Sequence, residues 1–368
     1  MLRPSTELAN TQCGVHFATV SDPRTYGLRR INLQAPRYCQ NLDVTVHNQW
    51  AGQKMITVKG ALIDNIPRPV GGPPLLPKGR AYLRSVIHEL VGAFCLETGT
   101  RPSVRYGWDV VAILFEDKIV VRLPKTASAW MKMQREEIVL GRIAPMLPYP
   151  VPLPQTMTTP CRLSVHRMIQ GRNLSQSVYR SLSRARKGCL AEQLAELFLA
   201  LHAIPPSLFG FSVQQSVTGV TLTDTLHRIG TEQKWQWLHY LEKPLTKGFA
   251  RWPEFHDQAV FSHFDLQGSN ILVDPKTTHI SGIVDFLDCG MGSKFYDMSK
   301  VSKIDVGLME RVWRLYRNRA EMAAGLIQLL AAYGILEQLS DILIREISPA
   351  KATRRMTRVQ KLVELLKD

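Results

Sequence analysis

The sequence predicts an α+β protein with a small sheet lobe followed by a larger, mainly helical lobe. Two short apolar runs, Val110–Phe115 and Ile119–Leu123, are separated by three residues and are typical of paired strands. From about residue 172 onward, apolar residues recur mostly at helical spacing. A run rich in proline and glycine at 66–77 cannot form regular structure and is expected to be a linker or wrapping loop.

The chain of 368 residues therefore divides into three parts. Residues 1–75 form an N-terminal extension whose role the sequence does not indicate, although 44–46 and 55–58 are strand-like. Residues 76–170 are the predicted N-terminal lobe, and residues 171–368 are the predicted C-terminal lobe.

In the N-terminal lobe, residues 80–96 have the apolar spacing of an amphipathic helix and precede the paired strands. A second helix is expected at 127–143 and ends before the proline-rich run 147–154. Residues 161–168 predict a further strand, which Gly171 closes. In the C-terminal lobe, helices are expected at 190–202, 229–250, 308–332 and 334–366.

The composition limits the class of protein. Hydrophobic residues make up 45% of the chain, no apolar run is long enough to span a membrane, and the N-terminus has no signal-peptide pattern. Six scattered cysteines indicate free thiols in a reducing cytoplasm, so we expect a cytoplasmic protein with no membrane partner. The net charge of +15 favours anionic partners, but the charges are dispersed, which makes nucleic-acid binding a weak alternative.

The most informative residues lie in two short segments, 263–274 and 283–289. Asp265 and Asn270 have the spacing of a phosphoryl-transfer catalytic loop, H-x-D-x-x-x-x-N. Apolar strands broken by a proline turn predict a hairpin that brings Asn270 and Asp285 side by side. A carboxylate near an attacking hydroxyl, with an amide and a second carboxylate to bind magnesium, is what phosphoryl transfer requires. The alternative is that these carboxylates only cap turns, as most loop Asp residues do.

These motifs, in this order along residues 80–305, resemble the aminoglycoside phosphotransferase family, a branch of the kinase-like fold. The strand Ile119-Val-Val-Arg-Leu-Pro-Lys125, the helix residues Arg135-Glu-Glu-Ile-Val-Leu140 and Leu194–His202 also match that family, as does Phe295-Tyr-Asp297. The resemblance implies a two-lobed protein-kinase-like fold. It also implies transfer of the γ-phosphoryl group of ATP or GTP to a hydroxyl group of a small molecule, such as an antibiotic or a metabolite.

The resemblance also assigns roles to residues. Asp265 is the expected catalytic base or orienter of the acceptor hydroxyl, and Asn270 and Asp285 are the expected Mg²⁺ ligands. Arg122 is the expected contact for the nucleotide phosphates, with Glu136 orienting it.

The remaining assignments are structural or concern the adenine. Backbone near Arg167 and Met168 is expected to bind adenine, and Lys125 competes with Arg122 as the phosphate-binding cation. His202 and Asp297 are expected to brace the core and the catalytic segment without taking part in chemistry. An alternative for Arg122 is a structural role at a strand edge.

The chain departs from the family pattern at Phe264, where a glycine is usual, and at Gln267, where a cationic residue is common. The loop at about 99–109 has two glycines and no G-x-G-x-x-G. These changes affect the expected rate and the phosphate donor more than the reaction class.

A small-molecule kinase is the leading hypothesis, and a protein kinase or a nucleotide-binding scaffold with weak catalysis is the alternative. The chain has Asp285-Phe-Leu in place of Asp-Phe-Gly and no Ala-Pro-Glu segment, which argues against a protein kinase. The basic chain favours an acceptor less cationic than an aminoglycoside, although Asp288, Glu254 and Asp257 could form a local acidic pocket.

Overall fold

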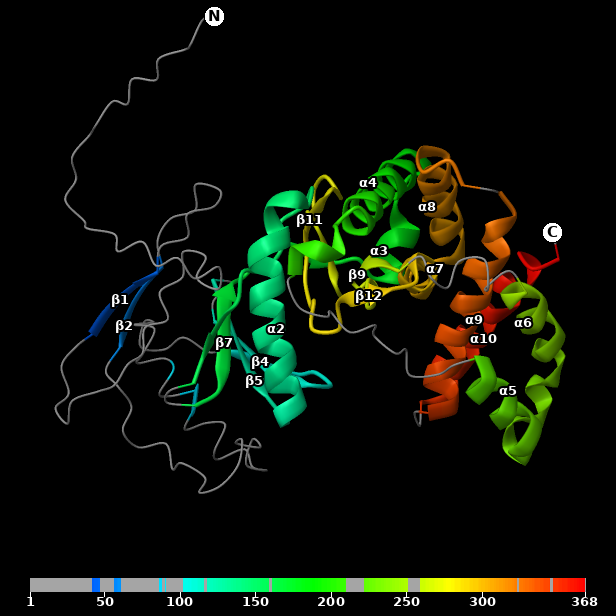
Figure 1. Ribbon diagram of the computed structural model, residues 1–368, viewed down its shortest axis with the longest axis horizontal. Coiled ribbons are helices and arrows are strands. Elements are labelled where there is room, and N and C mark those ends of the chain that lie inside the picture. Colours follow the sequence, from blue (N-terminus) through cyan, green and yellow to red (C-terminus); the bar gives the residue numbers. More distant parts are fainter. Residues whose placement is uncertain are drawn as a thin grey trace, which may run out of the picture. The chain divides into compact units, whose positions relative to one another are not determined.

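The computed structural model describes most of both predicted lobes and a small part of the N-terminal extension (Figure 1). The described residues are 42–46, 56–60, 86–87, 90, 102–115, 118–158, 161–209, 222–250, 259–322, 324–344 and 347–367. The strand-like segments of the extension are confirmed as an antiparallel pair, β1 (Leu42–Val46) and β2 (Ile56–Gly60). The rest of residues 1–75 lies outside the described residues.

The N-terminal lobe contains a five-stranded antiparallel sheet in the order β3-β4-β5-β7-β6. Its strands are β3 (Ser103–Tyr106), β4 (Val110–Phe115), β5 (Ile119–Pro124), β6 (Gln155–Met157) and β7 (Leu163–Arg167). The predictions of β4, β5 and β7 are confirmed. The edge strands β3 and β6 were not predicted, because neither has a regular alternation of buried and exposed residues.

Helix α2 (Ala127–Ile143) has the bounds that the sequence predicts. It begins at Thr126, whose hydroxyl accepts a hydrogen bond from the amide of Ala129 at 3.0 Å. It ends at a single 3₁₀ turn, η1 (Ala144–Met146), which contains a proline. Figure 1 shows α2 alongside β4, β5 and β7.

Only part of the predicted helix at 80–96 is described, at Val86, Ile87 and Leu90. These three residues are helical, and Val86 and Leu90 are buried in one cluster with the inner face of the sheet.

The C-terminal lobe is mainly helical, as predicted. Its helices are α3 (Gln176–Ser181), α4 (Arg184–His202), α5 (Leu222–Thr231), α6 (Glu242–Phe249), α7 (Lys294–Ser299), α8 (Val306–Arg319), α9 (Ile327–Ile344) and α10 (Pro349–Glu364). In the described part of this lobe, these 3₁₀ helices lie between them: η2 (Pro206–Phe209), η3 (Gln233–Leu241), η5 (Lys300–Lys303) and η6 (Ala324–Leu326). A large core of buried side chains from α4, α8 and α9 holds this lobe together.

Three predicted helix boundaries are wrong. The segment 229–250 is divided at Glu232, where the backbone is extended before η3 begins. The segment 308–332 is divided after α8, because Glu321 adopts a φ of 53° that a helix does not allow. The segment 334–366 is divided because Ser348 is extended and Pro349 opens α10.

The predicted hairpin is confirmed as β10 (Ile271–Val273) and β11 (Ile280–Ile283), with Ile271 opposite Ile283. The strand β8 (Arg172–Asn173) pairs with β10 on its other side. A second antiparallel pair, β9 (Val260–Ser262) and β12 (Gly290–Gly292), flanks the hairpin in sequence. The two motif segments therefore occupy the β9–β10 and β11–β12 connections.

None of the helices in the described residues has the length and apolar character needed to span a membrane.

Candidate active site

The side chain of Asp265 is oriented by two neighbouring amides. Its Oδ2 atom accepts hydrogen bonds from Asn270 Nδ2 at 2.8 Å and from Gln267 Nε2 at 3.0 Å. Asn270 Nδ2 also donates to the carbonyl of Asp265 at 2.8 Å, which closes the loop on itself. Among the described residues, none donates a hydrogen bond to the second carboxylate oxygen, Oδ1. Asp265 is therefore fixed on one side and available on the other.

The backbone before Asp265 is held by one buried carboxylate. Asp297 accepts hydrogen bonds from the amide of His263 at 3.1 Å and from the amide of Phe264 at 2.7 Å. His202 Nε2 lies 3.3 Å from Asp297 Oδ2, and its Nδ1 lies 3.0 Å from the hydroxyl of Tyr316. These contacts agree with the predicted bracing roles of His202 and Asp297.

Phe264, the bulky residue that follows His263, adopts the left-handed region of the backbone, with φ of 63°. This conformation is unfavourable for a bulky residue. Two features offset it: the two amide bonds to Asp297, and burial of the Phe264 ring against Tyr296 and Gly292. A Cβ atom on Gly292 would collide with that ring, so the glycine makes room for the phenylalanine.

Gly268 has a comparable steric role inside the loop. A Cβ atom there would collide with the carbonyl oxygen of Leu174. Leu174 in turn donates its amide to the carbonyl of Ile271 at 2.9 Å, so the loop packs closely against the start of the C-terminal lobe.

Asp285 lies beside this loop, as the sequence predicts. The amide of Val284 donates to the carbonyl of Asn270 at 2.9 Å, and His263 Nε2 lies 3.1 Å from the carbonyl of Val284. The backbone of Asp285 has φ of 70°, which is uncommon outside glycine and is found at constrained sites.

The surroundings of Asp285 disfavour its charged form. Desolvation by the surrounding protein, together with the nearby carboxylates of Glu136 and Asp265, raises the pKa of Asp285 to about 7, although Arg122 acts in the opposite direction. Part of the side chain is nevertheless exposed. An exposed carboxylate surrounded by other carboxylates is a position that a cation would stabilise.

The oxygen atoms at this position fit Mg²⁺. Asp285 supplies a carboxylate without a hydrogen bond from any described residue, and Asn270 supplies an amide oxygen. Within the described part of the chain, His, Cys, Asp and Glu side chains form no group of three that could hold a metal ion by itself. Mg²⁺ usually takes one or two protein oxygen ligands and completes its shell with phosphates and water.

Arg122 and Glu136 form a buried ion pair between β5 and α2. Arg122 Nη1 lies 3.1 Å from Glu136 Oε1, Nη2 also contacts Oε2, and Nε donates to the hydroxyl of Ser164 at 3.1 Å. Burial lowers the pKa of Arg122, but the adjacent Glu136 outweighs this effect, so the net shift is upward. The arginine is therefore a permanent positive charge at the base of the site.

Glu136 also contacts the segment that carries Asp285. Its Oε1 accepts a hydrogen bond from the amide of Phe286 at 3.1 Å. The sequence predicts that Glu136 orients Arg122, but it does not predict this third contact, since Glu136 and Phe286 are 150 residues apart.

Lys132 is a second cation that the sequence analysis missed. It donates to Asp109 at 2.8 Å and to Asp288 at 2.7 Å, and so joins the β3–β4 turn to the segment after Asp285. Lys125, the predicted competitor of Arg122, instead donates to the carbonyl of Gly107 in the same turn. Hydrophobic periodicity could not reveal Lys132, because its partners come from distant segments.

Arg167 and Met168 lie at the end of β7, where the N-terminal lobe leads into the C-terminal lobe. The amide of Met168 donates to the carbonyl of Lys118 at 2.8 Å, and His166 Nδ1 lies 2.8 Å from the carbonyl of Arg167. An adenine that bound this backbone would therefore compete with the hydrogen bonds that Met168 and Arg167 already form within the sheet.

A buried ion cluster lies behind the catalytic loop. Glu337 Oε1 lies 2.7 Å from Lys300 Nζ, and Glu337 Oε2 lies 2.8 Å from Lys303 Nζ. The hydroxyl of Tyr296 donates to Glu337 at 2.5 Å. Asp265 acts electrostatically on both Lys300 and Tyr296, so this cluster contributes to the field at the site.

His166 provides a test of the sheet that carries Arg122. Burial and the positive charge of Arg122 lower the pKa of His166 to about 3. The folded protein thus binds fewer protons than the unfolded chain, whose histidine titrates near pH 6.5. The contribution of neutral His166 to the free energy of unfolding is complete above about pH 6.5. Below that pH the free energy of unfolding falls by about 1.4 kcal/mol per pH unit, until the pH reaches the folded pKa.

We expect His166→Gln to reduce the loss of thermal stability between pH 7.5 and pH 5, compared with wild type. The control is His239→Gln, since His239 is half-exposed on the surface. Melting curves at both pH values measure the effect. An unchanged pH dependence in His166→Gln would contradict the assignment.

The chain resembles known proteins in sequence pattern and in fold. The family model described as "Phosphotransferase enzyme family" matches residues 103–335. No curated protein matches the chain in sequence.

Solved structures are similar in fold. An aminoglycoside 2'-phosphotransferase-IIIa variant in complex with GDP has a TM-score of 0.57 at 19% identity, over 77% of this chain and 96% of that chain. ADP-bound aminoglycoside phosphotransferase APH(2'')-Ib has a TM-score of 0.52 at 18% identity, over 76% and 97%. The macrolide 2'-phosphotransferase MphH from Brachybacterium faecium has a TM-score of 0.51 at 18% identity, over 77% and 97%. The predicted two-lobed, kinase-like α+β fold is thereby confirmed.

Proposed function

This chain belongs to the phosphotransferase enzyme family, and we propose that it transfers the γ-phosphoryl group of ATP or GTP to a hydroxyl group of a small molecule. The observation that carries this proposal is the state of the Asp265 carboxylate. Two amides hold Oδ2, while Oδ1 accepts no hydrogen bond from the described residues. A general base needs this combination of fixed orientation and a free oxygen.

In the proposed reaction, the acceptor hydroxyl gives its proton to Asp265 as its oxygen forms a bond to the γ-phosphorus. The bond from that phosphorus to the bridging oxygen breaks, and the products are a phosphomonoester and a nucleoside diphosphate. The protein contributes mainly by positioning and by stabilising charge, since this transfer needs little covalent assistance.

Asn270 and Asp285 would hold Mg²⁺, which neutralises charge on the phosphates when it is bound. Asp285 is available for this role because no described residue donates a hydrogen bond to it. Arg122, which is fixed by Glu136, supplies positive charge from the N-terminal lobe.

A nucleotide donor is supported by the similar folds, two of which are complexes with GDP and ADP. The adenine or guanine would lie near Arg167 and Met168, at the end of the sheet. Because the Met168 amide is already bonded to Lys118, the base would have to replace that bond or use other atoms of this edge.

A protein substrate is less well supported. Between Asp285 and α7 the chain forms only a short turn and the strand β12. A peptide-docking loop of the kind found in protein kinases has no room in this interval.

The proposed acceptor is less cationic than an aminoglycoside. Asp288, one of the three acidic residues that could form a pocket for a cation, is already paired with Lys132 at 2.7 Å. Glu254 and Asp257 lie outside the described residues. The buried Lys300 and the half-buried Lys303 carry two positive charges against the one negative charge of Glu337, and Asp265 acts electrostatically on Lys300.

The test is a nucleotide-consumption screen of the purified protein with ATP and GTP against macrolides, aminoglycosides, sugars and amino alcohols. We expect acceptor-dependent release of diphosphate with at least one hydroxyl compound, and identification of its phosphomonoester by mass spectrometry. Nucleotide binding without turnover on any compound would favour a scaffold. Turnover restricted to aminoglycosides would contradict the proposed acceptor class.

Replacing Asp285 with Ala should weaken binding of Mg-nucleotide as well as lower the rate, because a hard oxygen ligand is lost. Calorimetric titration with the nucleotide in the presence and absence of Mg²⁺ measures the change. The control is Asp274→Ala, which removes a carboxylate from the exposed turn of the same hairpin. If Asp285→Ala binds Mg-nucleotide as tightly as wild type, Asp285 is not a metal ligand.

A further inference from the structure

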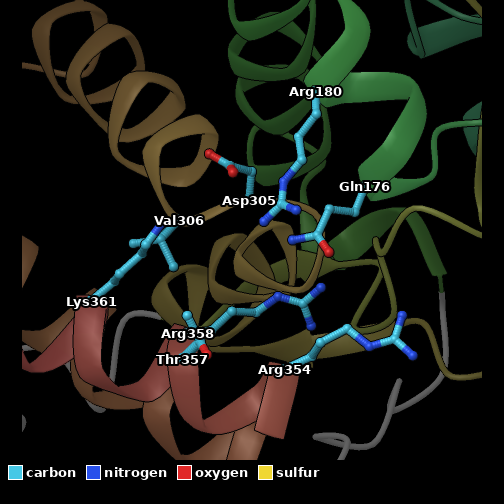
Figure 2. A pocket seen from close by; sticks show the side chains of 8 residues that line it. All are labelled: Gln176, Arg180, Asp305, Val306, Arg354, Thr357, Arg358 and Lys361. Atoms are coloured by element: carbon cyan, nitrogen blue, oxygen red, sulfur yellow. The ribbon is translucent and has the colours of Figure 1, made fainter. Parts of the chain in front are cut away.

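A cavity of about 170 Å³ lies in the C-terminal lobe between α3, the start of α8 and α10 (Figure 2). It is lined by Gln176, Arg180, Asp305, Val306, Arg354, Thr357, Arg358 and Lys361. None of these residues belongs to the candidate active site. The cavity is smaller than the roughly 300 Å³ at which pockets for drug-sized ligands begin.

The charge of the cavity is strongly unbalanced. Four of its side chains are cationic (Arg180, Arg354, Arg358 and Lys361), and one is a carboxylate. That carboxylate, Asp305, already accepts a hydrogen bond from the amide of Leu308 as the N-terminal cap of α8. Within the part of the chain that is described, neither Arg180 nor Arg358 nor Lys361 forms an ion pair.

Arg358 has an unsatisfied hydrogen-bond donor in this arrangement. Its Nε atom is buried and has no hydrogen-bond partner among the described residues. Burial and the positive charges of Arg355, Arg180 and Arg354 lower the pKa of Arg358, against a smaller opposing effect of Asp305. Figure 2 shows the guanidinium groups of Arg180 and Arg358 extending toward each other from α3 and α10, with the amide of Gln176 between them.

We infer that this cavity binds an oxyanion of the phosphate class, either free phosphate or the phosphate group of a small phosphomonoester. Two facing guanidinium groups repel each other unless an anion lies between them, and their planar donors match phosphate oxygens. The hydroxyl of Thr357 on α10 and the amide of Gln176 on α3 provide uncharged polar groups on the two opposite walls. The volume of about 170 Å³ accommodates one phosphate group.

Binding should also stabilise the protein, because the anion joins α3 to α10. A ligand that binds only the folded state raises the melting temperature, and the rise grows with the logarithm of the ligand concentration relative to its Kd. The probes are inorganic phosphate and glycerol phosphate, titrated at constant ionic strength against chloride. Saturating Mg-ADP is present throughout, so that phosphate sites of the nucleotide are occupied.

Arg358→Gln should weaken phosphate binding by about tenfold or more, which is typical for loss of a charge-assisted hydrogen bond. Arg180→Gln, on the opposite wall, should have the same effect and serves as a second variant if Arg358→Gln does not fold. The control is Arg314→Gln, because Arg314 is an exposed arginine of α8 that pairs with Glu310 and does not line the cavity. It removes the same charge and should leave binding unchanged.

Glycerol phosphate binding more tightly than inorganic phosphate would identify the ligand as a phosphomonoester, and the reverse order would identify free phosphate. Equal affinity in wild type, Arg358→Gln and Arg180→Gln would overturn the inference. So would equal stabilisation by chloride, which indicates general screening. Tight binding of a single-stranded oligonucleotide with no response to phosphate would overturn it too, because the cavity would then belong to a polyanion surface.

Discussion

Replacing Asp265 with Asn is expected to lower turnover by about 10²- to 10⁴-fold, the usual contribution of a general base. Asn is the same size and can keep one contact to Asn270 or Gln267, so the loop should retain its shape. Nucleotide binding should be largely preserved, because the carboxylate is expected to face the acceptor hydroxyl and not the phosphates. Steady-state kinetics with an identified acceptor and calorimetry with Mg-nucleotide separate the two effects.

Asp305→Asn is the matched control for this substitution. It makes the same chemical change at the start of α8, where Asn caps a helix about as well as Asp. Turnover of Asp265→Asn within a few-fold of this control would remove Asp265 from the role of catalytic base.

Replacing Glu337 with Gln should cost about 3–5 kcal/mol of unfolding free energy, the range for removing one partner of a buried ion pair. Glu337 forms ion pairs with both Lys300 and Lys303, and it also accepts a hydrogen bond from the hydroxyl of Tyr296. The two lysines hold the pKa of Glu337 well below its ordinary value despite its burial. Its contribution to stability is therefore present above about pH 4.5 and is lost only in strong acid.

Denaturant unfolding at neutral pH measures this effect. Glu310→Gln removes an exposed carboxylate paired with Arg314 and should change stability by less than about 1 kcal/mol. Adding Lys300→Met to Glu337→Gln should recover part of the loss, because one stranded cation is removed. If Glu337→Gln loses no more unfolding free energy than Glu310→Gln, water compensates the positive charges of Lys300 and Lys303 in place of Glu337.

The sequence predicts elements whose own residues determine them. Strands β4 and β5 and helix α2 have apolar residues at the spacing of their structure, and α2 also has a capping threonine. The edge strands β3 and β6 lack such a pattern, because pairing with a neighbour and not burial holds them in the sheet. Breaks in the C-terminal helices were missed because apolar spacing continues across Glu321 and Ser348.

In the candidate active site, too, the sequence predicts local contacts and misses contacts between distant segments. Asp265 and Asn270 are five residues apart, so their contact follows from local loop geometry. The contacts of Asp297 with the loop and of Lys132 with Asp288 join segments 33 to 156 residues apart, which sequence spacing cannot reveal. The catalytic role of Asp265 and the metal-binding role of Asp285 remain predictions for the experiments above.

The three contacts of Glu136 connect the N-terminal lobe to the segment that carries Asp285. One carboxylate binds Arg122 on β5 and the amide of Phe286, while its own backbone belongs to α2. A rotation of α2 that withdrew this carboxylate would leave the buried amide of Phe286 without its acceptor, at a cost of about 1–3 kcal/mol. Arg122 would lose its carboxylate partner and keep the hydrogen bond from its Nε to the hydroxyl of Ser164. The residue after Asp285 would then lose its anchor. A displacement of α2 would thus act on the carboxylate proposed to bind Mg²⁺ without contacting it, through the hydrogen bond between Glu136 and the amide of Phe286.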